Sequence, residues 1–204
     1  MIHFDEREIR SEDLHLVAAT IRPLYRHLWP DAEAWTQLQR MKEFDRPHLQ
    51  LVWTNDELIA FGLYFIQAFD RRTVVYRAGS IVHRDYRNAG LYVRMVHRMI
   101  DRNPGMDAYM TRTREMFVYR AFRTAALLAG DLELLPPEPH LNALAPLNAE
   151  WRTVATHFCD GASVHADGRI THVYSKPRET ELGRRLGLSN TGAIMLRLLP
   201  TPRS

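Results

Sequence analysis

The sequence is poor in cysteine and lysine, and it has no long apolar run. Its single cysteine, Cys159, cannot form a disulfide within the chain. That favours a reducing compartment, and we expect a cytoplasmic protein. The opening stretch MIHFDEREIR lacks an apolar core, and runs such as Leu58–Ile66 are too short to cross a bilayer. We therefore expect no signal peptide and no membrane partner.

Lysine occurs only at Lys42 and Lys176, so arginine carries almost all of the positive charge. This bias is typical of a GC-rich bacterial genome, and arginine also binds phosphates and carboxylates through its planar guanidinium group. The formal net charge of +3 is spread along the chain, and no helix carries a basic stripe, which argues against a nucleic-acid partner. With 46% hydrophobic and 25% charged residues, the composition predicts an ordinary globular protein.

Hydrophobic periodicity and turn residues predict an alternation of strands and helices. In the first half, the predicted elements are a strand at 2–9, helices at 12–29 and 32–43, and strands at 48–54, 58–69 and 73–83. In the second half they are helix 91–102, strand 106–113, helix 115–129, strand 132–135, helix 149–158, hairpin 162–175, helix 179–188 and strand 193–199. Short turns between the three strands from 48 to 83 predict an antiparallel meander. The crossover through helix 91–102 predicts that the strands on either side of it are parallel.

The turn RDYRNAGLY, residues Arg84–Tyr92, lies between a predicted strand and a predicted helix. Such a turn leaves backbone N–H groups without helical acceptors at the positive end of the helix dipole, which forms an anion site. Gly90 allows a close approach of the backbone or a positive φ angle, while Arg84 and Arg87 add positive charge. A diphosphate is the expected ligand, although neither the dinucleotide-binding nor the P-loop glycine pattern is present.

The residues Val82–Leu91, VHRDYRNAGL, resemble motif A of the GNAT acyltransferase superfamily, whose consensus is roughly V-x-P-x-Y-R-G-x-G-[LI]-[GA]. Arg87 and Gly90 match its Arg-x-x-Gly core, and the predicted order of elements is similar over 1–135 and at the last strand. The resemblance implies an α/β GNAT fold, with a mixed, mostly antiparallel sheet of six to seven strands, splayed central strands and flanking helices. It also implies one acyltransferase-like domain over 1–204, with 136–190 inserted before the last strand and covering the acceptor side.

The resemblance further implies that acetyl-CoA or another acyl-CoA binds as co-substrate, without a metal. Two adjacent segments would hold the coenzyme. The backbone amides of the turn would bind the pyrophosphate, with Arg87 beside them: Asn88, Ala89, Gly90, Leu91 and Tyr92. The end of the preceding strand would pair with the pantetheine amides: Ile81, Val82 and His83.

Three positions depart from the family motif. Arg84 stands in place of the proline, and Asn88 replaces the first glycine but tolerates the left-handed conformation. Tyr92 replaces a small residue at the start of the helix. Its ring could crowd the pyrophosphate, turn outward or stack on the ligand.

The stretch TRTREMFVYRAF places Tyr119 about two turns into a helix, where tyrosines of the family protonate the departing thiolate. At helical spacing with Met116 and Phe122, the alternative role of Tyr119 is that of a core residue with a satisfied hydroxyl group. Many relatives place a glutamate base on the strand that here reads TVVYRAGSIVH, without a carboxylate. The remaining candidates for the base are His83, Glu115 and Glu138, and we assign Glu115 to the catalytic residues beside Tyr119.

Arginines surround the predicted helix 115–129, and histidines are frequent in the inserted segment. Most of the arginines are expected on a solvated face, while one or two could meet the 3′-phosphate of the coenzyme or an acidic acceptor: Arg112, Arg114, Arg120 and Arg123. The histidines accompany Cys159 without a C-x-x-C pair, so we predict no metal site: His140, His157, His165 and His172.

The expected function is the transfer of an acetyl or other acyl group from coenzyme A to an amine of a small-molecule acceptor, by direct attack in a ternary complex. One alternative is an acyltransferase on the same fold that uses an acyl carrier protein as donor. Another is a non-catalytic protein that binds acyl-CoA, which the missing strand carboxylate and Tyr92 favour. By analogy with the family alone, exposed strand edges near the C-terminus are compatible with a homodimer.

Overall fold

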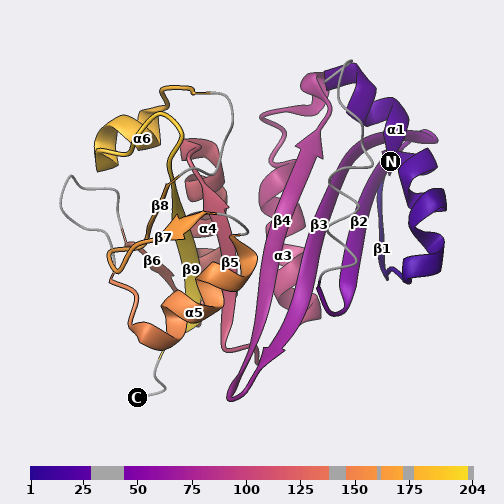
Figure 1. Cartoon of the computed structure of the whole chain (residues 1–204). Helices are drawn as coiled ribbons and strands as arrows, with labels where there is room; N and C mark the ends of the chain where they lie inside the picture. Colours follow the sequence, from indigo (N-terminus) through magenta and orange to yellow (C-terminus); the bar gives the residue numbers. More distant parts are fainter. Residues whose placement is uncertain (29–43, 138–145, 160–161, 172–176, 202–204) are drawn as a thin grey trace. The chain divides into compact units, whose positions relative to one another are not determined.

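The computed structural model describes residues 1–28, 44–137, 146–159, 162–171 and 177–201, which are drawn in colour in Figure 1. They form two compact units, Met1–Met99 and Ile100–Ser204. Several predictions fall outside the described residues: the helix at 32–43, and the candidates Glu138, His140 and His172.

The first unit contains a four-stranded antiparallel sheet in the order β1-β2-β3-β4. Its strands are β1 (Ile2–Glu8), β2 (Pro47–Thr54), β3 (Glu57–Phe69) and β4 (Arg72–Val82). Asn55 and Asp56 join β2 to β3, and their positive φ angles of 46° and 65° suit the two-residue turn of a twisted hairpin. The predicted antiparallel meander is confirmed.

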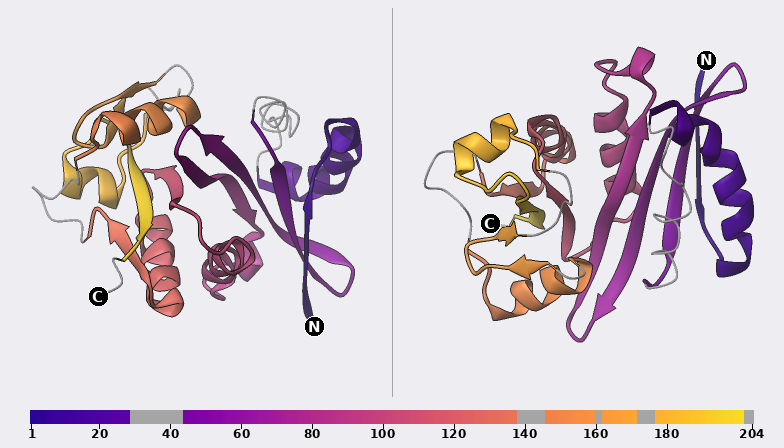
Figure 2. Two further views of the ribbon diagram at one scale, coloured as in Figure 1. Left: turned by 90° about the horizontal axis from the view of Figure 1, so that it is seen from below. Right: turned by 45° about the horizontal axis from the view of Figure 1, so that its top comes forward.

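Two helices cover opposite faces of this sheet, as Figure 2 shows. On one face lies α1 (Leu14–Leu28), which follows the 3₁₀ turn η1 (Ser11–Asp13). On the other lies α3 (Leu91–Arg102), which follows the 3₁₀ turn η3 (Arg84–Tyr86). Buried apolar side chains join α3 to the sheet: Val52, Ile59, Ala60, Leu91 and Met95. Because Leu91 opens the helix, this packing fixes the end of the preceding turn against the sheet.

The second unit is organised around β9 (Ala193–Pro200), which pairs antiparallel with three other strands. These are β5 (Ala108–Thr113) along one edge, and β6 (Leu132–Leu135) and β8 (Arg169–Thr171) along the other, with β7 (Ser163–Val164) paired to β8. The helices are α4 (Met116–Ala129), α5 (Ala149–Phe158) and α6 (Glu181–Leu186). Side chains of α4 and α5, among them Tyr119, Phe122 and Phe158, are fully buried in this unit.

The α/β class with helices flanking a sheet is confirmed. The described residues contain nine strands, of which seven belong to the predicted sheet and two form the short β7–β8 hairpin of the inserted segment. This hairpin is the one predicted within 162–175, and the N–H group of Gly168 closes its turn on the carbonyl of His165 at 3.0 Å. No helix in the described part of the chain is long and apolar enough to span a membrane.

Candidate functional site

At the end of β4, η3 carries the chain round to α3 in a tight turn. The N–H group of Asp85 donates to Nδ1 of His83 at 3.4 Å, and that of Tyr86 donates to the His83 carbonyl at 3.0 Å. Asn88 and Gly90 have φ angles of 66° and 71°. The left-handed conformations that the sequence leads us to expect at these two positions are therefore present.

The N-terminus of α3 is open to solvent. The first helical hydrogen bond runs from the N–H group of Arg94 to the Gly90 carbonyl, over 3.1 Å. By helix geometry, the amides of residues 91–93 have no acceptor within the helix and lie at the positive end of its dipole. Gly90 is exposed, and a Cβ atom built on it would meet nothing within 4 Å. A phosphate group can therefore approach this backbone from solvent.

The two arginines of the turn have different surroundings. Arg84 pairs with Asp85 at 3.5 Å, and both side chains are 68% exposed, so the pair contributes little to stability. Arg87 donates from Nε to the Val82 carbonyl at 3.4 Å, which holds its guanidinium group at the end of β4. The turn thus carries one solvated positive charge and one that is tethered to the sheet.

Tyr92, which replaces a small residue of motif A, turns its ring toward the sheet. The guanidinium carbon of Arg77 lies 5.1 Å from the centre of this ring, within the range of a cation–π contact. Arg77 belongs to β4 and is 1% exposed. The ring therefore packs on a buried cation beneath α3. From the sequence, we expected the ring to crowd the pyrophosphate, turn outward or stack on the ligand, and the observed orientation is none of these.

Arg77 belongs to a buried polar network that crosses the sheet of the first unit. Its Nη1 atom donates to Oε1 of Gln50 at 2.8 Å. Gln50 in turn donates from Nε2 to the Met95 carbonyl at 2.9 Å and to a carboxylate oxygen of Glu6 at 3.3 Å. The Tyr64 hydroxyl donates to the other oxygen of Glu6 at 2.5 Å. The network links all four strands of the unit to the backbone of α3.

Gly62, on β3, leaves the space that the Arg77 guanidinium occupies. A Cβ atom at Gly62 would lie 2.4 Å from Nη2 of Arg77 and 2.9 Å from Cε of Met95. The sequence offers one signal for this arrangement, an isolated glycine inside the apolar run LIAFGLYFIQAF, which marks the close approach of another group. Arg77 and Gln50 are not among the residues predicted for the site from the sequence.

In the second unit, Tyr119 is 1% exposed. Its hydroxyl group donates to the Pro136 carbonyl at 3.2 Å and also contacts the Pro137 carbonyl. Both carbonyls directly follow β6, so the hydroxyl group ties α4 to the start of the inserted segment. These are the surroundings of a core tyrosine with a satisfied hydroxyl group, and the catalytic role of Tyr119 stays a prediction.

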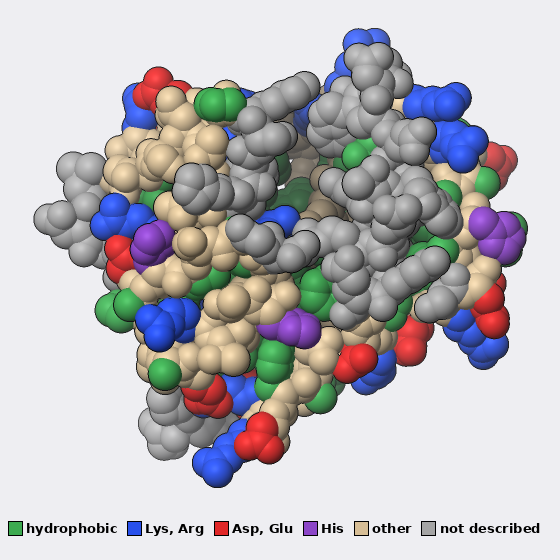
Figure 3. All heavy atoms as spheres, viewed as in Figure 1, with side chains coloured by type: hydrophobic (Ala, Val, Ile, Leu, Met, Phe, Trp, Pro, Cys, Tyr) green, Lys and Arg blue, Asp and Glu red, His purple; other side chains and the backbone are tan. Residues whose placement is uncertain are grey.

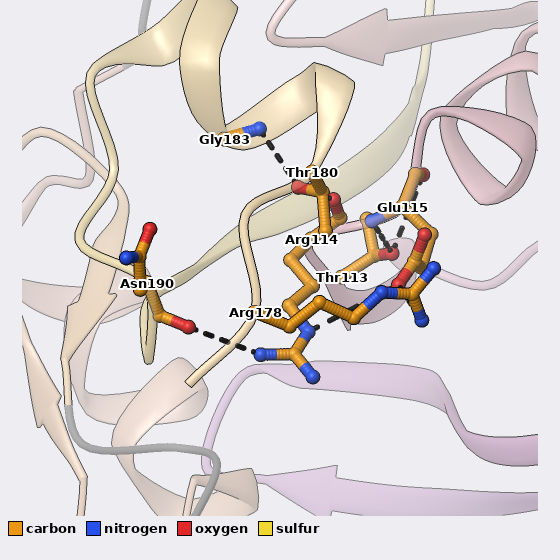
Figure 4. A network of polar contacts seen from close by, with 7 residues as sticks. All are labelled: Thr113, Arg114, Glu115, Arg178, Thr180, Gly183 and Asn190. Carbon is orange, nitrogen blue, oxygen red and sulfur yellow. Dashed lines mark hydrogen bonds and ion pairs between the residues drawn. The ribbon is translucent and has the colours of Figure 1, made fainter. Parts of the chain in front are cut away.

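Glu115 lies between β5 and α4, at the N-cap position of the helix (Figure 4). Its carboxylate is 3.4 Å from Nη1 of Arg178 and 4.0 Å from Nε of Arg114. Its N–H group donates to Oγ1 of Thr113 at 2.9 Å. The structure thus brings Glu115 together with two guanidinium groups, one of which, Arg178, sequence analysis did not single out.

The remaining predicted positions are mostly solvated. Arg120 and Arg123 are exposed on α4, as expected, and so are His157 and His165. Among the residues that the structure describes, no group of three or more His, Cys, Asp and Glu side chains could hold a metal ion. On the face drawn in Figure 3, Lys and Arg side chains are dispersed among Asp and Glu side chains and form no continuous basic patch.

The comparisons with known proteins identify the family of this chain. Residues 14–117, which are more than half of the chain, match the profile of the acetyltransferase (GNAT) family. No curated protein sequence matches the chain. The chain belongs to the GNAT acetyltransferase family, and the resemblance first seen in VHRDYRNAGL is confirmed.

Solved structures of similar fold cover nearly the whole chain at low identity. An acetyltransferase from Bacillus subtilis in complex with CoA is 11% identical, with a TM-score of 0.53 over 98% of this chain and 99% of that chain. The ribosomal-protein-S18-alanine N-acetyltransferase from Escherichia coli is 12% identical, with a TM-score of 0.46 over 99% of this chain and 97% of that chain. At 11% identity, the likeness to the Bacillus subtilis structure concerns the fold alone.

Proposed function

We propose that the chain transfers an acetyl or other acyl group from coenzyme A to an amine of a small molecule. The observation that carries this proposal is the exposed turn Arg84–Tyr92. The turn coincides with motif A of the GNAT family, to which the chain belongs. In it, the left-handed residues Asn88 and Gly90 lead into the N-terminus of α3. The pyrophosphate of a coenzyme supplies the negative charge that such a turn attracts.

In this proposal, the amides from Asn88 to Tyr92 hold the pyrophosphate, and Arg87 lies beside them. The backbone from Ile81 to His83 pairs with the pantetheine amides in the manner of an added strand. The Val82 carbonyl accepts the 3.4 Å hydrogen bond from Arg87. Because this bond is long, a pantetheine amide can replace it at small cost, which would free Arg87 to turn toward the pyrophosphate.

The acceptor amine attacks the thioester carbonyl carbon, so that a C–N bond forms and the C–S bond breaks. The attacking nitrogen loses a proton to a base, and the departing thiolate gains a proton from an acid. Holding both substrates in one complex supplies much of the rate. We assign the base to Glu115, a carboxylate that can accept a proton, and the acid to Tyr119.

The assignment of Tyr119 has a structural requirement. Its hydroxyl group has to turn away from the carbonyls of Pro136 and Pro137 before it can donate to a thiolate. The competing role is the anchoring of the segment after β6, with no part in the chemistry. The substitution Tyr119→Phe separates the two roles: the anchoring role predicts a change in the free energy of unfolding alone, and the acid role also predicts a fall in kcat.

The experiment that tests the proposed function is a measurement of thiol release from acetyl-CoA and longer acyl-CoA donors with a panel of small amines. Release that depends on the amine, and that Gly90→Trp abolishes, is the expected result. Release only from acylated carrier protein would favour the carrier-dependent alternative. Binding of acyl-CoA without release by any amine would favour the non-catalytic alternative.

A further inference from the structure

The second unit contains a pocket of about 180 Å³ that the proposed chemistry does not use. It lies between the end of β5, the start of α6 and the segment that leads to β9. Its polar lining comes mainly from six residues: Arg114, Arg178, Glu179, Thr180, Arg184 and Asn190. At roughly 30 Å³ per water molecule, the volume equals about six waters, which is room for a small polar group and part of the molecule that carries it.

Arg114 is the fixed part of this pocket. Its side chain is 13% exposed, and Nη1 donates to the Asn190 carbonyl at 3.2 Å (Figure 4). Its own carbonyl accepts a hydrogen bond from Thr180 Oγ1 at 2.6 Å, and that hydroxyl oxygen accepts the Gly183 N–H group at 3.0 Å. Nη1 of the guanidinium group is thus bound to the Asn190 carbonyl, Nε lies 4.0 Å from the Glu115 carboxylate, and the backbone of Arg114 is fixed by Thr180. A ligand that binds this guanidinium group does not have to order it first.

The other two guanidinium groups lie at the solvent side of the pocket. Arg178 is 65% exposed and 3.4 Å from Glu115, and Arg184 is 66% exposed and 3.1 Å from Glu179. Exposed pairs of this kind are weak, so either arginine can turn to a ligand at little cost. The lining carries three guanidinium groups and one carboxylate, that of Glu179, and the Glu115 carboxylate lies beside Arg114 and Arg178. Together these five groups leave one positive charge in excess.

We propose that this pocket binds the carboxylate group of the acyl acceptor. An excess of one positive charge matches one singly charged carboxylate better than a dianionic phosphate. Guanidinium groups also present parallel donors that fit the two oxygens of a carboxylate. The inference rests on the proposed function for the role of the ligand as acceptor, and it narrows the acceptors to small amines that also carry an acid group.

The first test is a binding titration without coenzyme, so that its result does not depend on the proposed function. The probes are 4-aminobutyrate and 4-aminobutyramide, which differ only in the charge of the acid group. The wild type should bind the carboxylate at least tenfold more tightly than the amide. Arg178→Gln should reduce this preference about tenfold, because a charge-assisted hydrogen bond is lost.

A matched pair of variants on α6 controls for the change in net charge. Arg184 lines the pocket, whereas Arg185 pairs with Glu181 at 2.7 Å on the same helix and does not line it. Arg184→Gln should weaken binding of the carboxylate, and Arg185→Gln should leave it unchanged. Equal binding of the two probes by the wild type, or equal effects of the two substitutions, would overturn the inference.

The second test separates the acceptor from the coenzyme as the source of the anion. The affinities of CoA and of dephospho-CoA, which lacks the 3′-phosphate, are measured in the wild type and in Arg178→Gln. We expect the substitution to leave both affinities unchanged, while the KM for 4-aminobutyrate rises and that for 4-aminobutyramide stays constant. If the substitution weakens CoA and not dephospho-CoA, the pocket binds the 3′-phosphate and the carboxylate assignment is wrong.

Discussion

Gly62→Ala provides a sharp test of the network beneath α3. The added Cβ atom would lie 2.4 Å from Nη2 of Arg77, whereas ordinary contacts of a Cβ atom begin near 3.4 Å. The guanidinium group must therefore move by about 1 Å, which disturbs its 2.8 Å hydrogen bond to Gln50 and its contact with the ring of Tyr92. Gly62 lies within β3 and is not among the glycines of positive φ, so the expected cost comes from this overlap.

We expect Gly62→Ala to lower the free energy of unfolding by about 1–3 kcal/mol, as overpacking of a filled interior does. For a chain of this length, that corresponds to a fall in Tm of roughly 3–10 °C. Arg77→Met removes the nearer of the two overlapping atoms and leaves Cε of Met95 at 2.9 Å, so Gly62→Ala should cost less in that background. Thermal unfolding of the two single variants and the double variant measures the coupling, which we expect to exceed about 1 kcal/mol.

The same variants connect the network to the turn. Because Tyr92 belongs to both the network and the proposed pyrophosphate site, Gly62→Ala should weaken the binding of acetyl-CoA although residue 62 lies within a strand. Additive costs of Gly62→Ala and Arg77→Met, with no coupling, would refute the reasoning from the 2.4 Å overlap. Unchanged affinity for acetyl-CoA in a destabilised Gly62→Ala variant would refute the link to the turn.

Three further predictions concern single positions. Burial lowers the pKa of His48, which stacks on Tyr64, so the unfolded chain binds more protons than the native state and the free energy of unfolding should fall as the pH drops below about 6.5. In thermal melts from pH 7.5 to 5.5, Tm should therefore fall less in His48→Phe than in the wild type. Tyr119→Phe should lower the free energy of unfolding by about 1 kcal/mol, because the hydrogen bond of the hydroxyl group is lost. If the hydroxyl group is the acid, kcat should also fall about a hundredfold or more, and an unchanged kcat would leave Tyr119 the anchoring role alone. Gly90→Ala and Gly105→Ala should each cost about 1–2 kcal/mol in chemical denaturation, since both positions have positive φ and open space around them; a much smaller cost would contradict the left-handed turn.

Local patterns predicted most of the first unit. The meander from β2 to β4 follows from apolar runs separated by Asn55-Asp56 and by Asp70-Arg71-Arg72, whose turn chemistry depends only on neighbouring residues. The turn at Gly90 was predicted for the same reason. The hairpin of β7 and β8 was predicted within 162–175 although its strands contain only two and three residues, because its turn is also a local signal.

Long-range side-chain contacts account for what the sequence did not predict. Arg77 lies in a strand that reads TVVYRAGSIVH, where an isolated arginine resembles a solvated edge residue. Its burial depends on Gly62 and Gln50, which come from two other strands, and no local spacing relates the three. The same holds for Arg114 and Arg178, which meet at Glu115 across more than sixty positions of sequence.

The measurement that tests the central claim most directly is the thermal shift produced by acetyl-CoA in the wild type, Gly90→Trp and Gly105→Trp. Gly105 is the matched control, because it also has a positive φ and open surroundings but lies beyond the other end of α3. Saturation at a hundred times Kd stabilises the native state by about 2.7 kcal/mol, which raises Tm by roughly 5–10 °C. We predict this rise in the wild type and in Gly105→Trp, and its loss in Gly90→Trp. An equal rise in all three proteins, or no rise in the wild type with any acyl-CoA, would contradict a coenzyme site at RDYRNAGLY.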